Sequence, residues 1–382
     1  MAGTGRLVWA ALAVAVGFFP AIGRGETVLL ASSRNGWIEF VDLNTLQVKG
    51  RLFTGSMTES VVAGTDGRTL FVTKPRASEP EGCCALYAFD LKERISKELL
   101  WPSGAAVVLP GANEIVTQRG NVGIEVFNAH TLLRMPTLKA PGIYGLHPSP
   151  DGRWLFGTNT FGSTLDIFDM QRSVLLRSIP VPSKGTLSGA WLGSCFYLYA
   201  QDRTRRQLWK VSIHQTELDE GSTVQLPGVS DSDVAFGSAV GMNGHLLLYD
   251  RFGSKLDRRS RATTALAGGI YEVDPASGSV ISSLVPDLHF SVIKADASGE
   301  KIFGIDVASE SWEAVRLVKV DRQSGHVDAA RELAPDVWNI NLAEIASGLI
   351  PQNCASSFVG LSYPLCALQY FKTFELSNGR SP

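Results

Sequence analysis

The stretch SPDGRWLFGTNTFGSTLDIFDMQRSVLLRSIPV, residues 149–181, reads as successive strands separated by turns. Trp154–Thr158 is an aromatic and aliphatic run, and Thr164–Asp169 alternates between apolar and polar side chains, as half-buried strands do. Val174–Val181 is a third run of this kind. The first run follows the turn Pro150-Asp151-Gly152, where proline presets φ and glycine accepts a positive φ. The stretch therefore predicts three consecutive strands of one small sheet.

The same phrase recurs along the chain, as an apolar run, a polar turn, a second run, and then Asp, Asn or Ser before another turn. Clear copies are TDGRTLFVTK (65–74) followed by ALYAFDLKER (85–94), ASGEKIFGID (297–306) followed by VRLVKVDRQSG (315–325), and MNGHLLLYD (242–250) followed by GGIYEVDPASG (268–278). The polar residue that closes the phrase falls at Asp42, Asp90, Asn128, Asp169, Ser212, Asp274 and Asp321. Its mean spacing of about 46 residues suits one four-stranded blade of a β-propeller.

Seven copies favour an all-β, seven-bladed β-propeller, because a closed ring leaves no long strand edge exposed. The ends of the repeat region support closure. The first copy, residues 27–42, begins at the second strand of the phrase and lacks an inner strand, whereas VWNINLAEI (337–345) is an alternating run with no successor. We therefore predict ring closure by N- and C-terminal strands within a propeller spanning residues 26–345. The alternative is a separate C-terminal strand packed elsewhere.

Residues 1–25 resemble a signal peptide. Arg6 gives a positive start, residues 7–19 form an apolar stretch too short to cross a bilayer comfortably, and Ala21-Ile22-Gly23 offers small residues for cleavage. We expect a periplasmic or secreted protein with no membrane span after signal cleavage, the alternative being an uncleaved N-terminal anchor. The net charge of −2 gives no reason to expect a nucleic-acid partner.

Cysteine usage argues against a bound cofactor. The five cysteines are Cys83, Cys84, Cys195, Cys354 and Cys366, with no CxxC or CxxCH spacing for a zinc knuckle, a thioredoxin-like site or c-type haem. Export permits disulfides, and we expect Cys354–Cys366 to close a loop in a tail, residues 346–382, packed on the propeller. We expect the adjacent Cys83 and Cys84 either to form a disulfide that stiffens their loop or to contribute one cysteine that bridges to that tail. No GxSxG, HExxH, P-loop or EF-hand motif appears, so we predict no cofactor, no metal and no catalytic residue.

The order SPDGRWLFGTN (149–159), STLDIFD (163–169) and a strand ending Ile179-Pro180-Val181 resembles the YVTN-type β-propeller repeat. The YVTN position reads Phe156-Gly157-Thr158-Asn159 here and Phe71-Val72-Thr73-Lys74 in the second copy. The resemblance covers roughly residues 26–345 and implies architecture more than function. In size and layout the chain also resembles the heavy chain of methylamine dehydrogenases, an exported seven-bladed platform for a separate quinone-bearing chain.

Propellers bind ligands at a mouth of the central channel, formed by the inner strands and the segments that enter them. We expect inner strands at Ser60–Gly64, Ala105–Leu109, Ile143–His147, Leu187–Trp191, Asp233–Gly237, Phe290–Lys294 and Asn339–Ala343. The polar residues on or just before them that we predict to contact a ligand are Glu59, Tyr144, His147, Asp233, His289 and Asn339.

The function these features favour is that of a binding or scaffold protein for a protein or small-molecule partner at the channel mouth. One alternative is a platform subunit of a periplasmic amine-dehydrogenase-like oxidoreductase. Another is a propeller hydrolase or lactonase with a channel-mouth metal, which requires His147, Asp233 and His289 to converge. We expect the tryptophans to fill spaces between blades, with a carbohydrate platform as the alternative, and KLDRRSR (255–261) to form an exposed loop.

Overall fold

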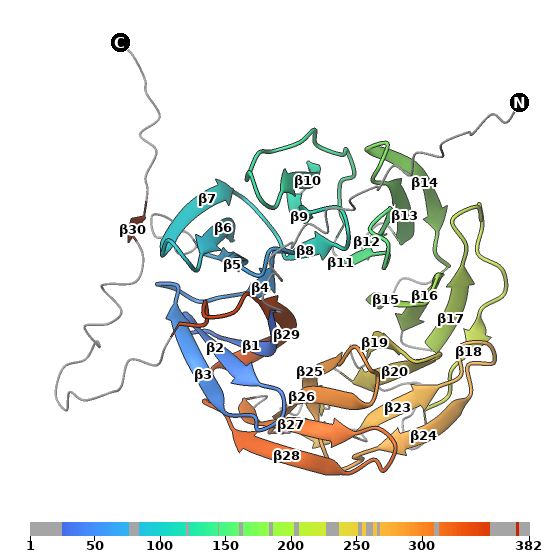
Figure 1. Ribbon diagram of the computed structural model, residues 1–382. Helices are drawn as coiled ribbons and strands as arrows, with labels where there is room; N and C mark the ends of the chain where they lie inside the picture. The colour runs from blue at the N-terminus through green and yellow to red at the C-terminus, as the bar shows by residue number, and fades with distance from the viewer. Residues whose placement is uncertain are drawn as a thin grey trace, which may run out of the picture.

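The computed structural model describes residues 25–75, 84–119, 122–143, 145–159, 163–182, 186–201, 206–226, 237–250, 254–256, 263–265, 268–308, 313–351 and 372–373. Their strands form antiparallel sheets arranged as seven blades around a central channel, which confirms the predicted propeller (Figure 1). No helix among the described residues is long and apolar enough to cross a membrane.

We number the blades from the one that contains the first strand, and give the strands of each from the channel outward. Blade 1 is β29 (Val337–Ile345), β1 (Glu26–Ser33), β2 (Trp37–Asp42) and β3 (Val48–Phe53). Blade 2 is β4 (Ser60–Ala63), β5 (Thr69–Lys74), β6 (Ala85–Asp90) and β7 (Ile95–Leu100). Blade 3 is β8 (Ala106–Leu109), β9 (Glu114–Arg119) and β10 (Gly123–Asn128). Blade 4 is β11 (Gly145–Pro148), β12 (Trp154–Asn159), β13 (Thr164–Asp169) and β14 (Val174–Pro180).

The remaining blades complete the ring. Blade 5 is β15 (Thr186–Leu192), β16 (Cys195–Gln201), β17 (Arg206–Val211) and β18 (Ser222–Thr223). Blade 6 is β19 (Gly237–Met242), β20 (His245–Asp250), β23 (Ile270–Val273) and β24 (Val280–Leu284). Blade 7 is β25 (Phe290–Ala295), β26 (Lys301–Val307), β27 (Ala314–Asp321) and β28 (Val327–Glu332).

The ring closes as the sequence predicts. β29 pairs antiparallel with β1 along its whole length, with Leu342 opposite Leu29. Figure 1 shows β29, in dark red, on the channel side of the blue strands β1 to β3. Side chains of β29 also join blade 1 to blade 2, since Trp338 Nε1 donates to the Thr58 carbonyl at 2.7 Å and Asn341 Nδ2 to the Val61 carbonyl at 3.1 Å. One strand therefore holds both its own blade and the next.

The recurring polar residue of the sequence phrase accepts hydrogen bonds from the backbone of the turn that follows it. Asp42 Oδ1 accepts hydrogen bonds from the backbone N–H groups of Asn44 at 3.0 Å and Thr45 at 2.8 Å. Asp90 and Asn128 accept the equivalent pairs of bonds in blades 2 and 3. The bond from Thr45 is the largest of the effects that hold the pKa of Asp42 below its usual value. These carboxylate and amide oxygens fold the turn into the outer strand.

The turn Pro150-Asp151-Gly152, which opens the sequence phrase, requires glycine at its last position. Gly152 has a φ of +68°, and a Cβ built there would lie 1.9 Å from the carbonyl oxygen of Pro110. The turn of blade 4 therefore touches the corresponding turn of blade 3 at a distance that only glycine allows.

Blade 3 differs from the four-stranded pattern, since its sheet contains three strands among the described residues. In place of an outer strand, the following segment makes isolated antiparallel bridges, Phe127 with Arg134 and Ile124 with Leu138. A second difference is in blade 6, where the inner strand is Gly237–Met242 rather than Asp233–Gly237. The inner strand of blade 4 also starts two residues later than predicted, at Gly145.

An ion-pair network replaces the missing outer strand of blade 3. Glu125 is completely buried. Its carboxylate accepts hydrogen bonds from Arg134 Nε at 2.7 Å and Nη2 at 2.5 Å, and from Thr137 Oγ1 at 2.8 Å. Arg119 Nη1 lies 3.3 Å from the same carboxylate. The fork of the Arg134 guanidinium therefore binds the segment after β10 to the buried strand.

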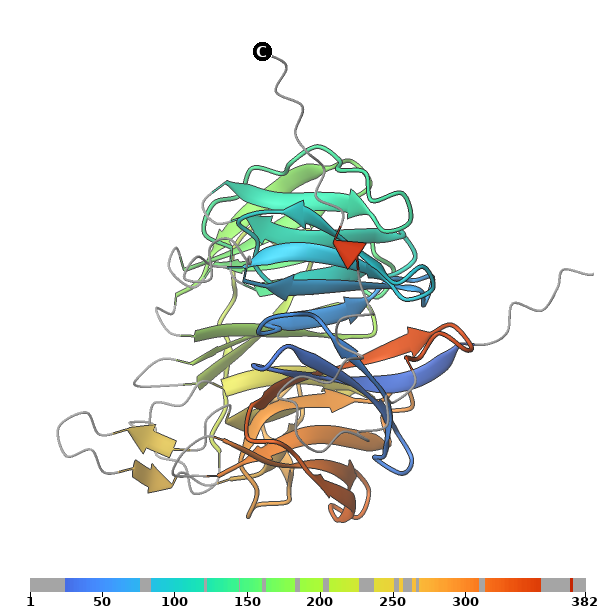
Figure 2. The same ribbon diagram turned by 90° about the vertical axis from the view of Figure 1, so that its left-hand side faces the viewer.

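Segments outside the ring are only partly described. β21 (Ser254–Leu256) pairs with β22 (Thr263–Ala265), so the basic segment around KLDRRSR begins in a hairpin rather than in a plain loop; Figure 2 shows the gold hairpin standing out from one face. In the tail, β30 (Lys372–Thr373) adds in parallel to β7 at the outer edge of blade 2. The expected signal peptide, and the bridge of Cys354 with Cys366, lie outside the described residues, and the described cysteines, Cys84 and Cys195, are not joined to each other.

Candidate functional site

A cavity of about 520 Å³ opens in the central channel where blades 1, 2 and 3 meet. Its walls are the inner strands β4, β8 and β29 with short flanking segments, and one side chain of β25 completes it: Ser60–Thr65, Ala105–Val108, Asn339–Glu344 and Lys294. Because hydrogen bonds within each blade set the positions of these strands, the cavity is preformed. Its volume is within the range of small-molecule sites.

Most polar side chains in the cavity wall already have a protein partner. Asn339 Nδ2 donates to the Glu59 carbonyl at 3.2 Å, and the amide of Asn341 bonds across the blade interface as described above. Ser60 Oγ donates to Thr73 Oγ1 at 3.1 Å, and Thr65 Oγ1 to Asn113 Oδ1 at 2.6 Å. These groups hold neighbouring blades and strands together.

Lys294 is different. It lies on the inner strand β25, opposite Phe303 of β26, and is half-buried. It forms no hydrogen bond or ion pair with any residue that the structure describes. Burial lowers the pKa of its ammonium group, because removal from water disfavours the charged form. The cavity thus contains an ammonium group that pairs with no side chain of the described residues, Glu344 of the same wall included.

Sequence reasoning missed Lys294, although the repeat contains a signal for it. The equivalent position of each inner strand lies opposite the third residue of the second strand, or opposite the fifth in blade 1, where β1 starts two residues earlier. From blade 1 to blade 7 it is occupied by Asn341, Val62, Val107, His147, Ala190, Val240 and Lys294. A lysine in a position that is mostly aliphatic or small is an exception that a register alignment of the copies exposes.

Of the six predicted ligand contacts, the structure brings one into the cavity wall, Asn339. Glu59 directly precedes β4, and its carboxylate accepts a hydrogen bond from the Cys84 thiol. His289 precedes β25, with its Nδ1 buried and unpartnered among the described residues. Tyr144 and Asp233 lie outside the described residues. Their roles in ligand binding stay predictions.

His147 lies on β11 in a non-polar setting. Its imidazole packs against Phe196 of blade 5, with ring centroids 5.6 Å apart, and its Nε2 is sealed from solvent without a hydrogen-bond partner among the described residues. Burial lowers the pKa of His147 to about 4. The side chain is therefore neutral at physiological pH and fills the space between two blades.

We expect this burial to make the fold acid-sensitive. Between pH 6.5 and about 4 the unfolded chain binds a proton at His147 that the native state does not, so stability falls as pH falls through this window, by up to about 3 kcal/mol. His147→Phe removes the effect, while His130→Gln, at an exposed site, leaves it in place. Urea unfolding at pH 7 and pH 4.5 measures it, and an unchanged pH slope in His147→Phe contradicts it.

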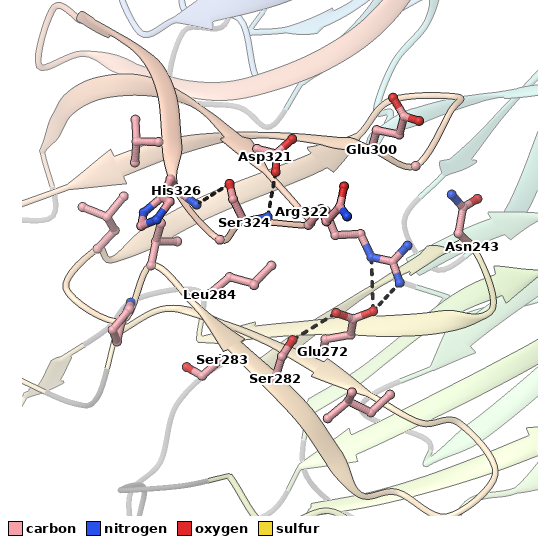
Figure 3. Close-up of a pocket in the computed structure, with 18 of the residues that line it drawn as sticks. Asn243, Glu272, Ser282, Ser283, Leu284, Glu300, Asp321, Arg322, Ser324 and His326 are labelled. Carbon is pink, nitrogen blue, oxygen red and sulfur yellow. Dashed lines mark hydrogen bonds and ion pairs between the residues drawn. The ribbon is translucent and has the colours of Figure 1, made fainter.

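A second cavity, an open groove of about 1020 Å³, lies between blades 6 and 7, bordered by β24 and the turn that connects β27 to β28 (Figure 3). On its wall Arg322 reaches from blade 7 to Glu272 of blade 6, with Nε 3.1 Å from Oε1. His245 Nδ1 lies 2.5 Å from the same oxygen, and Ser282 Oγ donates to Oε2 at 3.0 Å. The groove carries an ion pair that joins two blades.

The charges of this pair satisfy each other. Burial alone raises the pKa of Glu272, but hydrogen bonds from Arg322, His245 and Ser282 outweigh it, so the pKa lies below the usual value. Asp321, at the groove's edge, pairs with Lys301 at 2.6 Å. These charged side chains of the groove therefore have partners within the protein, whereas Lys294 in the channel has none among the described residues.

A third cavity, of about 770 Å³, is bordered by Trp154 of blade 4 and Trp191 of blade 5. Trp191 Nε1 donates to the His147 carbonyl at 3.1 Å, and its ring lies 5.0 Å from that of Phe156. These tryptophans fill the space between blades, as expected. The carbohydrate-platform alternative stays untested.

Among the described residues, no group of three or more His, Cys, Asp or Glu side chains is placed to hold a metal ion. His147 and His289 belong to different blades, 4 and 7, and Asp233 is not described. The metal-dependent hydrolase hypothesis requires all three residues to converge, and it stays a prediction because Asp233 lies outside the described residues.

No family model and no curated protein matches this chain, so the YVTN-type resemblance stays a prediction. Solved structures match by fold. The dihydro-heme d1 dehydrogenase NirN, in complex with DHE, aligns with a TM-score of 0.54 at 15% identity, over 82% of this chain and 65% of that chain. A functionally unknown protein from Desulfotomaculum acetoxidans DSM 771 aligns with a TM-score of 0.60 at 12% identity, over 84% of this chain and 99% of that one.

This chain spans less than two thirds of the length of NirN. In all, 1351 chains of solved structures match, so the architecture is widespread. At these identities the similarity shows the fold alone, and a function has to be argued from the site.

Proposed function

We propose that this chain is an exported binding protein that holds a small molecule in the channel cavity, without chemistry of its own. The observation that carries the proposal is the preformed cavity of about 520 Å³, whose walls are strands of three blades. Rigid walls favour binding because little conformational freedom is lost when a ligand enters. The complex of NirN with DHE shows a ligand on a chain of similar fold, which is in keeping with this role.

The test is to purify the tagged chain from its native extract and to analyse it by native mass spectrometry and metal analysis. We expect a small molecule at one copy per chain. Val107→Trp fills the cavity and should reduce ligand occupancy at least about 10-fold. Val240→Trp, at the equivalent position of blade 6 outside the cavity wall, is the matched control and should retain the ligand.

Other outcomes separate the competing functions. A ligand retained by both tryptophan variants would place the binding site elsewhere and contradict the proposal. A stoichiometric small protein subunit in the purified sample would favour the amine-dehydrogenase-like platform. One tightly bound divalent ion and no organic ligand would favour the hydrolase hypothesis.

A further inference from the structure

We propose that the ligand of the channel cavity is an organic monocarboxylate, whose carboxylate pairs with Lys294 and whose apolar body lies against β4 and β8. This inference rests on the proposed binding function and adds the chemical class of the ligand. Nothing else in the fold calls for a cation at this position, since the equivalent residues of blades 2, 3, 5 and 6 are valine or alanine.

Lys294 is half-buried, so its ammonium group is partly removed from water. Moving a charged group out of water without a partner is unfavourable, so buried charges in proteins are normally paired. The ordinary partner is absent here, because Lys294 has no acceptor among the described residues and Glu344, the other charged side chain of the wall, forms no ion pair with it. An anionic ligand supplies the missing counter-charge, and it restores the charged form that burial disfavours.

The side chains of the cavity wall indicate which chemistry the remainder of the ligand, beyond its carboxylate, would have. β4 contributes Val62 and Ala63, and the β8 segment contributes Val107 and Val108, all of them partly exposed. These aliphatic side chains offer contact area to a hydrocarbon body but no hydrogen bonds. Because the wall has one ammonium group and no arginine, it matches a single negative charge better than a phosphate or a dicarboxylate, which need several donors.

The same geometry predicts opposite effects of one substitution on stability and on binding. Lys294→Met keeps the length of the side chain and removes the unpaired charge, so we expect the melting temperature of the empty protein to rise by about 2 °C. A lysine with a structural partner would show the reverse, a fall in melting temperature. Lys294→Arg keeps the charge and serves as the conservative variant.

Isothermal titration calorimetry of the mature chain with sodium hexanoate, hexanamide and inorganic phosphate tests the inference. We expect hexanoate to bind at one per chain and at least about 10-fold more tightly than hexanamide, its uncharged isostere, because the carboxylate adds a charge-assisted hydrogen bond. Lys294→Met should weaken hexanoate binding about 10- to 100-fold, and Lys294→Arg should retain most of the affinity. Phosphate should not bind measurably.

Each contrary result has a distinct meaning. Equal binding of hexanoate and hexanamide, unchanged affinity in Lys294→Met, or no binding of hexanoate would overturn the inference. Phosphate binding that Lys294→Met abolishes would overturn the monocarboxylate in favour of a phosphorylated ligand. A neutral native ligand that Val107→Trp expels would leave the binding function standing and remove only its anionic class, whereas a native chain without any cavity ligand would remove both.

Discussion

A chain truncated after Asp336 is expected to lose cooperative unfolding altogether. The truncation removes β29, which is the inner strand of blade 1 and lies against β1 along its whole length. Val337, Ile340 and Ile345 of this strand are at most 5% exposed. At about 1.5–3 kcal/mol for each buried aliphatic side chain, their loss alone amounts to much of the roughly 5–15 kcal/mol by which a domain is stable.

The loss is larger than burial suggests because β29 has two neighbours. Its removal leaves the N–H and C=O groups of β1 unpaired at a new edge, and unpaired edges invite aggregation. It also removes the hydrogen bonds that Trp338 and Asn341 donate to blade 2. An open ring exposes the side faces of two blades to solvent, so the effect spreads beyond blade 1.

Circular dichroism during thermal unfolding and size-exclusion chromatography measure this outcome. A chain that ends at Pro351 is the matched control, because it keeps β29 and the contact of Leu349 and Ile350 with the core of blades 1 and 2. It should unfold cooperatively and elute as a compact species. A chain ending at Asp336 that melts as cooperatively as this control would show that β29 is not what closes the ring.

Ring closure could be predicted from the sequence because both the missing inner strand and the extra strand that replaces it are recognisable there. The first copy of the phrase lacks an inner strand, and residues 337–345 form a strand without a blade. The regular spacing of Asp42, Asp90 and their equivalents is visible for the same reason, since each closes a turn by accepting backbone hydrogen bonds. Features set by short-range chemistry can be read from the chain.

The predicted strand positions were wrong where the sequence matches the repeated phrase poorly. The inner strand of blade 6 was predicted at Asp233–Gly237, but it is Gly237–Met242. In blade 6 the turn to the second strand begins at Asn243, directly after the inner strand. Counting back from that turn gives the observed strand. In blade 3 the segment after Asn128 makes isolated backbone bridges to β10 and side-chain bonds to Glu125, and the described residues show no continuous outer strand there.

The site was harder to predict than the fold. The six residues predicted for the channel mouth were chosen for polarity, yet the described polar side chains of the inner strands mostly hold blades together, as Asn339 and Asn341 do. Whether a polar side chain is already paired depends on its neighbours in other blades, which for Asn339 and Asn341 are 280 residues away in the chain. An alignment of the copies exposes Lys294 as an exception, but that it is unpaired is apparent only when those neighbours are known.

The second large effect is expected at the buried carboxylate of blade 3. Arg134→Met removes two hydrogen bonds from Glu125, which is completely buried. Breaking a buried ion pair from one side leaves an uncompensated charge, so we expect a loss of about 3 kcal/mol in the free energy of unfolding. Thr137 and Arg119 remain beside Glu125, which keeps the loss at the lower end of the usual range.

A double-mutant cycle distinguishes this mechanism from simple loss of packing. Replacing both partners, Glu125→Leu with Arg134→Met, removes the charge and its counter-charge together, and such replacements are often neutral. We therefore expect the double variant to be more stable than Arg134→Met alone, by at least about 1 kcal/mol in urea unfolding. Arg51→Met, at a largely exposed arginine paired with Glu39, is the control and should cost less than about 1 kcal/mol. A double variant less stable than either single one would contradict this mechanism, and would mean that lost packing and hydrogen bonds, not an uncompensated charge, set the cost of Arg134→Met.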